Sequence, residues 1–307
     1  MTQLANQRIA YFNGKFLPES EVRVSFRDRG FKYGDAVFDM TRSFGHRIFK
    51  LKEHMDRFYR SLKYVRIDPG LSPAEMIRLS EETFERNRHL LDKDGDYWLG
   101  QRVSRGIADS VAGESSDEGP TVIIECTPLP LKQRAHYYRD GIDVVVPSVR
   151  RVGPESLSPR AKTHNYLNMI VGEHEAKAIN PDAWAVLLDV NGNLAEGIGS
   201  NIFVVREGVV YTPQERYVLP GVSRQTAIDM AKKLKIEVVE KDIDLFDAYV
   251  AEEAFITSTS FCICPVRSFN GNRMTNHQMP GPVTKRLIDA YVEFVKFDWY
   301  KQYLKHL

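Results

Sequence analysis

Residues 158–168 of the 307-residue chain read Ser-Pro-Arg-Ala-Lys-Thr-His-Asn-Tyr-Leu-Asn, and the fold is inferred outward from this stretch. Lys162 lies just before a helix that apolar periodicity predicts from Tyr166 to Lys177. A lysine is by default a solvated surface residue. A lysine with a depressed pKa, however, forms an imine with an aldehyde and then moves protons at the adjacent carbon. The motifs that follow Lys162 decide between these two roles.

The first of these motifs contains an acid among small residues. Glu196 lies in Asn193-Leu194-Ala195-Glu196-Gly197, ahead of a strand predicted from Asn201 to Val205. A carboxylate beside a pyridine nitrogen keeps that nitrogen protonated, which makes the ring an electron sink. Taken singly, Glu196 is better interpreted as an exposed turn glutamate.

Two further motifs have the composition of phosphate sites. Leu219-Pro220-Gly221-Val222-Ser223-Arg224 leads into a helix predicted from Gly221 to Leu234, and a helix start offers unpaired N–H groups and a positive dipole end. Thr257-Ser258-Thr259-Ser260 follows the strand-like Ala254-Phe255-Ile256 and offers hydroxyl and backbone donors. Each motif alone is equally typical of an ordinary helix cap or a polar turn.

The order of the four motifs is what is specific. The series K-x-x-N-Y-L-N, x-x-E-G-x-x-S-N-I-F, L-P-G-V-S-R and F-I-T-S-T-S resembles the fold-type IV (class IV) pyridoxal-phosphate (PLP) aminotransferases. That family includes branched-chain and D-amino-acid aminotransferases, (R)-amine transaminases and aminodeoxychorismate lyase. The segments Asp28–Phe38, Glu53–Phe58 and Gly281–Arg286 resemble the family too, so that the likeness covers nearly the whole chain.

The resemblance implies a PLP-dependent transaminase of class α+β with two domains. A smaller N-terminal α/β domain is expected over residues 1–126 and a larger C-terminal pseudo-barrel, the PLP-binding domain, over 134–307. The linker is predicted at 127–133 because the prolines of Thr127-Pro128-Leu129-Pro130-Leu131 exclude both helix and central strand. A homodimer is also implied by the resemblance.

Site residues follow from the resemblance position by position. Lys162 is expected to be the Schiff-base lysine and proton shuttle, and Glu196 the partner of the pyridine nitrogen. Arg57 matches the arginine that pairs with the cofactor phosphate, a role suited to a guanidinium. The remaining cofactor contacts are expected from Tyr166, near the ring hydroxyl, and from Val222, Ser223, Ser258 and Thr259 at the phosphate. At Ser258 the family often has glycine.

The substrate signals conflict. Tyr33, Phe38 and Arg42 resemble the pocket of branched-chain enzymes, yet the expected Tyr-x-Arg motif reads Tyr97-Trp98-Leu99 and lacks its arginine. Val103-Ser104-Arg105-Gly106 is similar to D-amino-acid aminotransferases, where Arg105 would bind a carboxylate; a solvated loop arginine is the alternative. A branched-chain-type amino acid donating to a 2-oxo acid is favoured.

Three alternatives stay open. Val149-Arg150-Arg151-Val152 and the aromatic tail from Phe294 to Leu304 resemble (R)-amine transaminases, so a D-amino-acid or (R)-amine donor is the second prediction. A lyase of the aminodeoxychorismate type is the third. A binding protein without activity would be expected to have lost Lys162 or Glu196, and the chain has both.

The charge and cysteine content exclude some classes of binding partner and compartment. The 42 basic and 41 acidic residues give a formal net charge of +1, which leaves no electrostatic footprint for nucleic acid or membrane. Three cysteines, Cys126, Cys262 and Cys264, form no disulfide framework and are predicted to be buried thiols, without metal, in a reducing compartment. No apolar signal or membrane segment is found, so a soluble cytoplasmic protein is expected. Ile107–Pro120 is predicted to be a solvated loop or an active-site cover.

Periodicity also predicts individual elements elsewhere in the chain. These are a hairpin of Ile9–Phe12 and Lys15–Leu17 around Asn13-Gly14, helices over Leu51–Leu62, Pro73–Leu91 and Val283–Phe297, and strands over Val122–Ile124, Ile142–Val146, Trp184–Leu188 and Phe261–Val266.

Overall fold

The computed structural model describes residues 7–107 and 119–307, and its chain falls into two compact units. Unit 1 comprises Met1–Leu129 together with Ala161–Asn165, and unit 2 comprises Pro130–Arg160 and Tyr166–Leu307. Most of the segment predicted to cover an active site, 107–120, lies outside the described residues. The assignment of domains to 1–126 and 134–307 stays a prediction.

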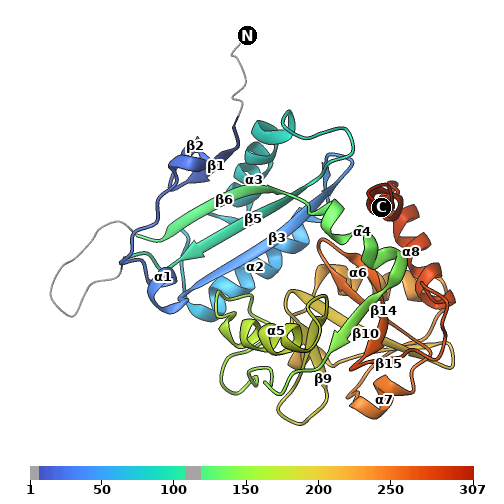
Figure 1. Ribbon diagram of the computed structural model, residues 1–307. Coiled ribbons are helices and arrows are strands. Elements are labelled where there is room, and N and C mark those ends of the chain that lie inside the picture. Colours follow the sequence, from blue (N-terminus) through green and yellow to red (C-terminus); the bar gives the residue numbers. More distant parts are fainter. Residues whose placement is uncertain (1–6, 108–118) are drawn as a thin grey trace. The chain divides into compact units, whose positions relative to one another are not determined.

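Unit 1 is built on a six-stranded antiparallel sheet in the order β2-β1-β6-β5-β3-β4 (Figure 1). The predicted hairpin is confirmed, with Asn13 and Gly14 both at positive φ in its turn. The strands are β1 (Ile9–Phe12), β2 (Lys15–Pro18), β3 (Ala36–Phe44), β4 (Arg47–Ile48), β5 (Tyr97–Ser104) and β6 (Thr121–Pro128).

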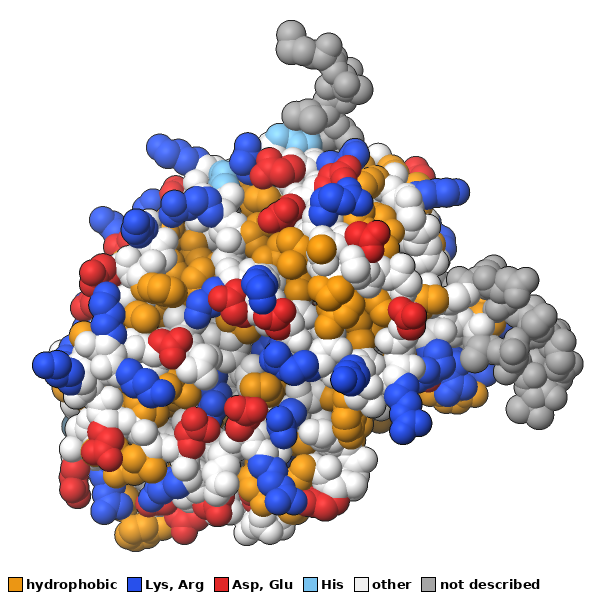
Figure 2. All heavy atoms as spheres, turned by 180° about the vertical axis from the view of Figure 1, so that it is seen from behind, with side chains coloured by type: hydrophobic (Ala, Val, Ile, Leu, Met, Phe, Trp, Pro, Cys, Tyr) orange, Lys and Arg blue, Asp and Glu red, His pale blue; other side chains and the backbone are white. Residues whose placement is uncertain are grey.

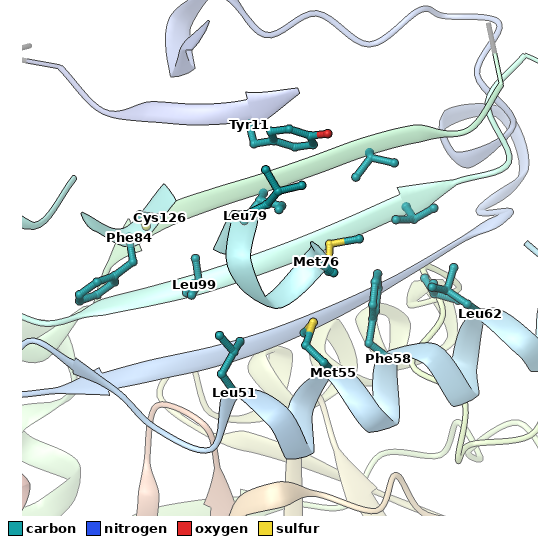
Figure 3. Close-up of a cluster of buried hydrophobic side chains, with 14 of the residues drawn as sticks. Tyr11, Leu51, Met55, Phe58, Leu62, Met76, Leu79, Phe84, Leu99 and Cys126 are labelled. Carbon is teal, nitrogen blue, oxygen red and sulfur yellow. The ribbon is translucent and has the colours of Figure 1, made fainter. Parts of the chain in front are cut away.

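Helices α2 (Leu51–Val65) and α3 (Pro73–Arg88) cover one face of this sheet, and the shorter η1 (Glu19–Glu21) and α1 (Arg29–Tyr33) lie before β3 in the chain. Both long helices were predicted from their apolar spacing, and a capping box between Ser72 and Glu75 begins α3. Figure 3 shows the buried side chains that the two helices direct at the strands, among them Met55, Phe58, Leu62, Met76, Leu79 and Phe84.

The opposite face of the sheet, which we call the outer face, is less apolar. Because side chains alternate along a strand, Phe38 and Met40 of β3 point away from the helices that pack on Val37. Their direct cross-strand partners on β5 are Arg102 and Gly100, and these in turn pair with Ile123 and Glu125 of β6. Apart from Gly100, these outer-face residues are half-buried.

Residues Ala161–Asn165 extend the sheet of unit 1 beyond β3. Val37 and Thr163 form an antiparallel bridge. The Phe38 N–H donates to the Lys162 carbonyl at 3.0 Å, and the His164 N–H donates to the Ala36 carbonyl at 2.9 Å. This pairing places the side chains of Lys162 and His164 on the outer face, beside Phe38.

Unit 2 contains a closed sheet. Its path runs β12-β11-β10-β13-β14-β7-β8-β9, and β9 pairs back with β10 to close a ring. The predicted pseudo-barrel and the α+β class are therefore confirmed. The strands are β7 (Ile142–Val145), β8 (Trp184–Leu188), β9 (Leu194–Gly197), β10 (Ser200–Arg206), β11 (Val209–Thr212), β12 (Val238–Glu240), β13 (Glu253–Ser258), β14 (Cys262–Phe269) and β15 (Asn272–Arg273).

Helices pack around this sheet. The three predicted from apolar spacing are present as α5, α6 and α8, with ends shifted by one or two residues. The helices are α4 (Leu131–Asp140), α5 (Leu167–Ile179), α6 (Val222–Lys233), α7 (Leu245–Tyr249), α8 (Pro282–Val295) and α9 (Trp299–Leu304), with the short η2 (Glu215–Tyr217). The last helix, α9, packs on α4, and the rings of Tyr138 and Tyr303 stack with centroids 4.3 Å apart.

The prediction that 127–131 breaks regular structure is wrong at both ends. Strand β6 continues to Pro128, which lies opposite Tyr97 as the last residue of the strand. Helix α4 begins at Leu131, directly after Pro130, which occupies its N-cap. Proline is tolerated at these terminal positions, because neither requires a backbone N–H from it.

The three cysteines are free and buried, as predicted, and burial raises the pKa of the Cys264 thiol well above its usual value. In the described part of the chain, no group of three or more His, Cys, Asp or Glu side chains could hold a metal ion. No helix within 7–107 or 119–307 is long and apolar enough to cross a membrane. Figure 2 shows acidic and basic side chains interspersed on one face of the molecule.

Candidate active site

Lys162 is held by its backbone in unit 1. Its N–H donates to Ser61 Oγ of α2 at 3.0 Å, and its carbonyl accepts from Phe38 of β3. The residue is 8 % exposed, and its Nζ lies 4.5 Å from the centroid of the Phe38 ring. Lys162 is therefore not a solvated surface lysine. Its side chain is buried against the Phe38 ring on the outer face.

Arg57 belongs to a buried cluster beneath α2. Its Nε and Nη2 donate to the two carboxylate oxygens of Asp39 at 2.9 and 2.7 Å, and His54 Nδ1 lies 2.7 Å from Asp39 Oδ1. Burial alone would raise the pKa of Asp39, but Arg57 and His54 hold it well below its ordinary value. Burial lowers the pKa of His54, against the pull of Asp39. Asp39 thus fixes the orientation of Arg57.

Glu196 is fixed equally well in unit 2. It is 3 % exposed and lies on β9, one of the strands that close the ring. Its Oε1 accepts from Arg151 Nε at 3.0 Å, and its Oε2 accepts from the Leu219 N–H at 2.9 Å. These two hydrogen bonds fix the direction of the carboxylate.

The start of α6 is linked to this carboxylate through Leu219, which precedes the helix by three residues. Gly221 occupies the N-cap, and no side chain of the described residues caps the helix. A Cβ at Gly221 would lie 2.2 Å from Asn201 Oδ1, so a larger residue would require the buried Asn201 side chain or the turn to move. Val222 and Ser223 follow as the first residues of α6, and both are buried. The N–H groups of this turn form a donor set suited to phosphate.

Strand β13 ends in the predicted hydroxyl run. The Ser258 Oγ accepts from the Phe261 N–H at 3.0 Å and lies 3.4 Å from Ser260 Oγ. Thr257 is fully buried, and its Oγ1 has no hydrogen-bond partner among the described residues. Thr259 is half-buried in the turn after the strand, and Tyr166 occupies the N-cap of α5.

The expected substrate residues differ in surroundings. Tyr33 is 59 % exposed, whereas Phe38 lies beside Lys162. Arg42 is buried, with its Nε donating to the Ser43 carbonyl at 2.9 Å, its Nη2 3.9 Å from Asp96 and its guanidinium 4.0 Å from the Phe44 ring centroid.

The hydrogen bonds of Arg105 within the described residues all go to groups of unit 1. Its Nε and Nη2 donate to both oxygens of Asp35, at 2.7 and 3.1 Å, and its other bonds reach the carbonyls of Val65 and Arg66. The pKa of Asp35 is lowered by Arg105 and Arg29, although burial opposes the shift.

Three residues of these clusters were not predicted as site residues from the sequence: Asp39, His54 and Arg151. In the sequence, Asp39 is one residue of an alternating strand pattern, and His54 is one residue of an amphipathic helix. Asp39 and His54 are 18 and 3 residues from Arg57, and Arg151 is 45 residues from Glu196. Only a structure or a set of relatives can bring such pairs together.

Known proteins agree with this architecture. The family model of amino-transferase class IV matches residues 36–269. A "Putative branched-chain-amino-acid aminotransferase" of Methanocaldococcus jannaschii is 37% identical over 290 residues, which are 94% of this chain and 96% of that protein. A D-alanine aminotransferase of Bacillus licheniformis is 28% identical over 281 residues, 91% of this chain and 94% of that protein.

Among solved structures, the branched-chain amino acid aminotransferase from Thermobaculum terrenum in its PLP form superposes with a TM-score of 0.81. It is 27% identical, and the match covers 98% of this chain and 97% of that chain. The closed sheet of unit 2 carries a buried carboxylate and leads to an uncapped helix start, and unit 1 carries a buried lysine. These are the features expected of a class IV aminotransferase. The chain belongs to the class IV aminotransferase family.

Proposed function

We propose that the protein is a PLP-dependent aminotransferase that moves the amino group of a branched-chain-type amino acid to a 2-oxo acid. The observation that carries the proposal is the burial of Lys162 against Phe38, which exposes its amine to an apolar rather than an aqueous surrounding. Membership of the class IV family supports the reaction class.

The residues present fit PLP. The uncapped N–H groups of Val222 and Ser223 and the hydroxyl turn at Ser258 and Thr259 supply donors for a phosphate ester. Glu196, held in place by Arg151, would supply the partner that a protonated pyridine nitrogen requires. When bound, PLP would contribute an aldehyde that takes up the amine and a ring that withdraws electrons from the substrate carbon.

We assign the following work to the chain's own residues. Lys162 would hold the cofactor, and its amine, once displaced by the incoming amino group, would carry a proton from the substrate's α-carbon to the former aldehyde carbon of the cofactor. Glu196 would face the ring nitrogen, and Tyr166 would lie near the ring hydroxyl. Arg57, oriented by Asp39, would add a charged hydrogen bond to the phosphate.

The identity of the amino donor rests on less evidence than the reaction class does. The branched-chain assignment is supported by the names of the relatives from Methanocaldococcus jannaschii and Thermobaculum terrenum, and by the apolar Phe38 and Met40 on the outer face near Lys162. A D-amino acid donor is the second candidate, favoured by the similarity to a D-alanine aminotransferase.

A covalent label tests the assignment of Lys162. Purified protein is expected to absorb in the visible range, and reduction with borohydride should attach the cofactor to one peptide, the one that contains Lys162. Lys162→Ala should bind the cofactor reversibly and lose labelling. Attachment to another lysine would contradict the assignment.

A donor panel tests the substrate. L-leucine, L-glutamate, D-alanine and an (R)-arylamine are added singly without an acceptor, and the cofactor spectrum is followed. We expect a change with L-leucine and L-glutamate. A response restricted to D-alanine and the arylamine would replace the branched-chain proposal, and pyruvate release from aminodeoxychorismate without acceptor would identify a lyase.

We also propose that the protein is a cytoplasmic homodimer. The apolar residues Leu167, Ile170 and Val171 of α5 are exposed by 72 %, 36 % and 41 %, more than a helix facing water usually carries. Three free cysteines fit a reducing compartment. Sedimentation equilibrium should give twice the chain mass of 35.2 kDa, and a monomer at micromolar concentration would contradict the dimer.

A further inference from the structure

The two arginines expected in the substrate site are both committed to other groups. Arg42 is buried among Ser43, Asp96 and Phe44, and Arg105 is held by Asp35 and two backbone carbonyls. Releasing Arg42 would break its contact with the buried Asp96. Releasing Arg105 would break its four hydrogen bonds and leave Asp35 with Arg29 alone. A carboxylate ligand therefore needs another partner near Lys162.

Arg102 lies on the outer face close to that lysine. It is the direct cross-strand partner of Phe38, and its guanidinium carbon is 5.3 Å from the Phe38 ring centroid. Lys162 Nζ is 4.5 Å from the same centroid, so that both cations gather around one ring.

The pairing of Arg102 is weak. Its one ion pair within the described residues joins Nη2 to Glu125 Oε1 at 3.4 Å, and the two side chains are 37% and 18% exposed. Both side chains are half-buried, and 3.4 Å is long for a charged hydrogen bond, so the pair holds Arg102 only weakly. The planar guanidinium has five N–H donors and is suited to bidentate binding of a carboxylate. An incoming carboxylate can thus displace or share Glu125 at little cost.

His164 adds a second polar group at the same place. Its ring lies edge-on to Phe38, with centroids 5.4 Å apart, and its Nε2 is buried without a hydrogen-bond partner among the described residues. Burial, and then the charge of Arg102, lower its pKa to about 4, while Asp28 opposes the shift, so the ring is neutral at pH 7. A neutral imidazole with Nε2 protonated donates one hydrogen bond.

We infer that Arg102, assisted by His164, binds the carboxylate of the amino acid and of the 2-oxo acid on the outer face of unit 1. Phe38 lies between this carboxylate subsite and Lys162 and would contact the carbon chain. The inference rests on the proposed transaminase function and assigns one contact within it. Arg102 is a binding residue in this proposal, and Glu125 is its partner in the absence of a ligand.

The test uses a matched pair of probes on the holoenzyme. 4-Methylvalerate carries a carboxylate on a branched aliphatic chain, and 4-methylvaleramide has the same shape without the charge. Isothermal titration measures the dissociation constant of each. Wild type should prefer the acid, and Arg102→Gln should weaken acid binding by about 10- to 100-fold, as expected for a hydrogen bond to a charged group. Binding of the amide should change less than about 3-fold.

Further variants separate binding from folding. Glu125→Gln should leave acid binding equal or tighter, because it removes the competing carboxylate. Arg102→Lys should recover part of the affinity, and His164→Gln should weaken acid binding by about 3- to 10-fold, the range of a neutral hydrogen bond. Arg88→Gln, on the exposed side of α3, is the surface control and should match wild type.

The outcomes are distinct. Acid binding within 2-fold of wild type in a folded, cofactor-loaded Arg102→Gln overturns the inference, as does loss of the acid preference in Arg105→Gln alone. If wild type itself takes up no PLP, or transaminates no amino acid, the proposed function fails before Arg102 is tested. If wild type transaminates and Arg102→Gln keeps its acid preference, only the assignment of Arg102 fails.

Discussion

At the scale of single residues, the stability of unit 1 depends on one buried charge cluster. Asp39 neutralises Arg57 and contacts His54, and none of the three is more than 3 % exposed. Removing one partner of a buried pair leaves the other charge uncompensated, which costs about 3–5 kcal/mol.

We therefore expect Asp39→Asn to lower the free energy of unfolding by about 3 kcal/mol, measured by urea denaturation. The control is Asp56→Asn, which breaks the exposed pair with Lys52 on α2 and should cost less than about 0.5 kcal/mol. Because the folded pKa of Asp39 lies below the unfolded value of about 3.9, its contribution is present above pH 4 or so and is lost on acidification. Equal loss in both variants would contradict the cluster's role.

His164 makes a second acid-sensitive contribution. The pKa of His164 is about 4 in the folded chain and about 6.5 in the unfolded chain. Between these two pH values the imidazole is therefore protonated in the unfolded chain but not in the folded chain. Stability should fall as the pH falls from about 6.5 to about 4, by about 3 kcal/mol for this residue. Chemical denaturation across this range should show a shallower slope for His164→Gln than for wild type, whereas the exposed His277→Gln should leave the slope unchanged.

Glu196→Gln tests the acid of unit 2. The amide keeps the shape and loses the charge that Arg151 holds in place. Cofactor binding should survive, followed by absorbance, while turnover falls by at least about 100-fold, the scale of an electrostatic contribution in an active site. Unchanged turnover would remove Glu196 from the proposed mechanism.

At the scale of elements, the sequence predicts what is local. Alternation and helical spacing located the β1–β2 hairpin, α2, α3, β8, α6 and α8, because each depends on residues near in the chain. The proline run was misjudged, since Pro128 and Pro130 occupy terminal positions that the residue type alone does not distinguish from interior ones. The motif residues Lys162 and Glu196 were found through resemblance, but their holding partners Ser61 and Arg151 come from distant segments.

The start of α6 supplies a prediction at this scale. Gly221→Ala would bring a Cβ to 2.2 Å from Asn201 Oδ1, which forces either the turn before α6 or the Asn201 amide, bonded to the Leu219 carbonyl, to move. We expect a loss of about 1–3 kcal/mol in stability and at least a 10-fold weaker affinity for PLP, measured by titration of the apoenzyme. Ser72→Ala, which removes the cap of α3, should cost about 1 kcal/mol and leave PLP affinity unchanged.

At the scale of the whole molecule, the chain does not divide at one point. Unit 1 includes Ala161–Asn165, although the residues on both sides of that segment belong to unit 2. The bridge between Val37 and Thr163 and the bonds of Phe38 and His164 complete the edge of β3. Sequence alone could not reveal this return, because five residues between two stretches of another unit carry no compositional boundary.

A fragment comparison tests the return. A chain of residues 1–129 should melt at a lower temperature than the same chain joined by a short glycine-serine linker to residues 159–166, because the latter restores the pairing along Ala36–Phe38. Circular dichroism gives both midpoints. Equal midpoints would mean that the returning strand adds nothing to unit 1.

The returning strand also sets an order of events during synthesis. When Leu129 leaves the ribosome, Ala161–Asn165 have not yet followed it, so unit 1 cannot yet close the edge of β3. At roughly 5–20 residues per second, the nascent chain waits about a few seconds with that edge unpaired. An open edge is a template for pairing with other chains, so any delay in synthesis that lengthens this interval would favour association of incomplete chains through β3.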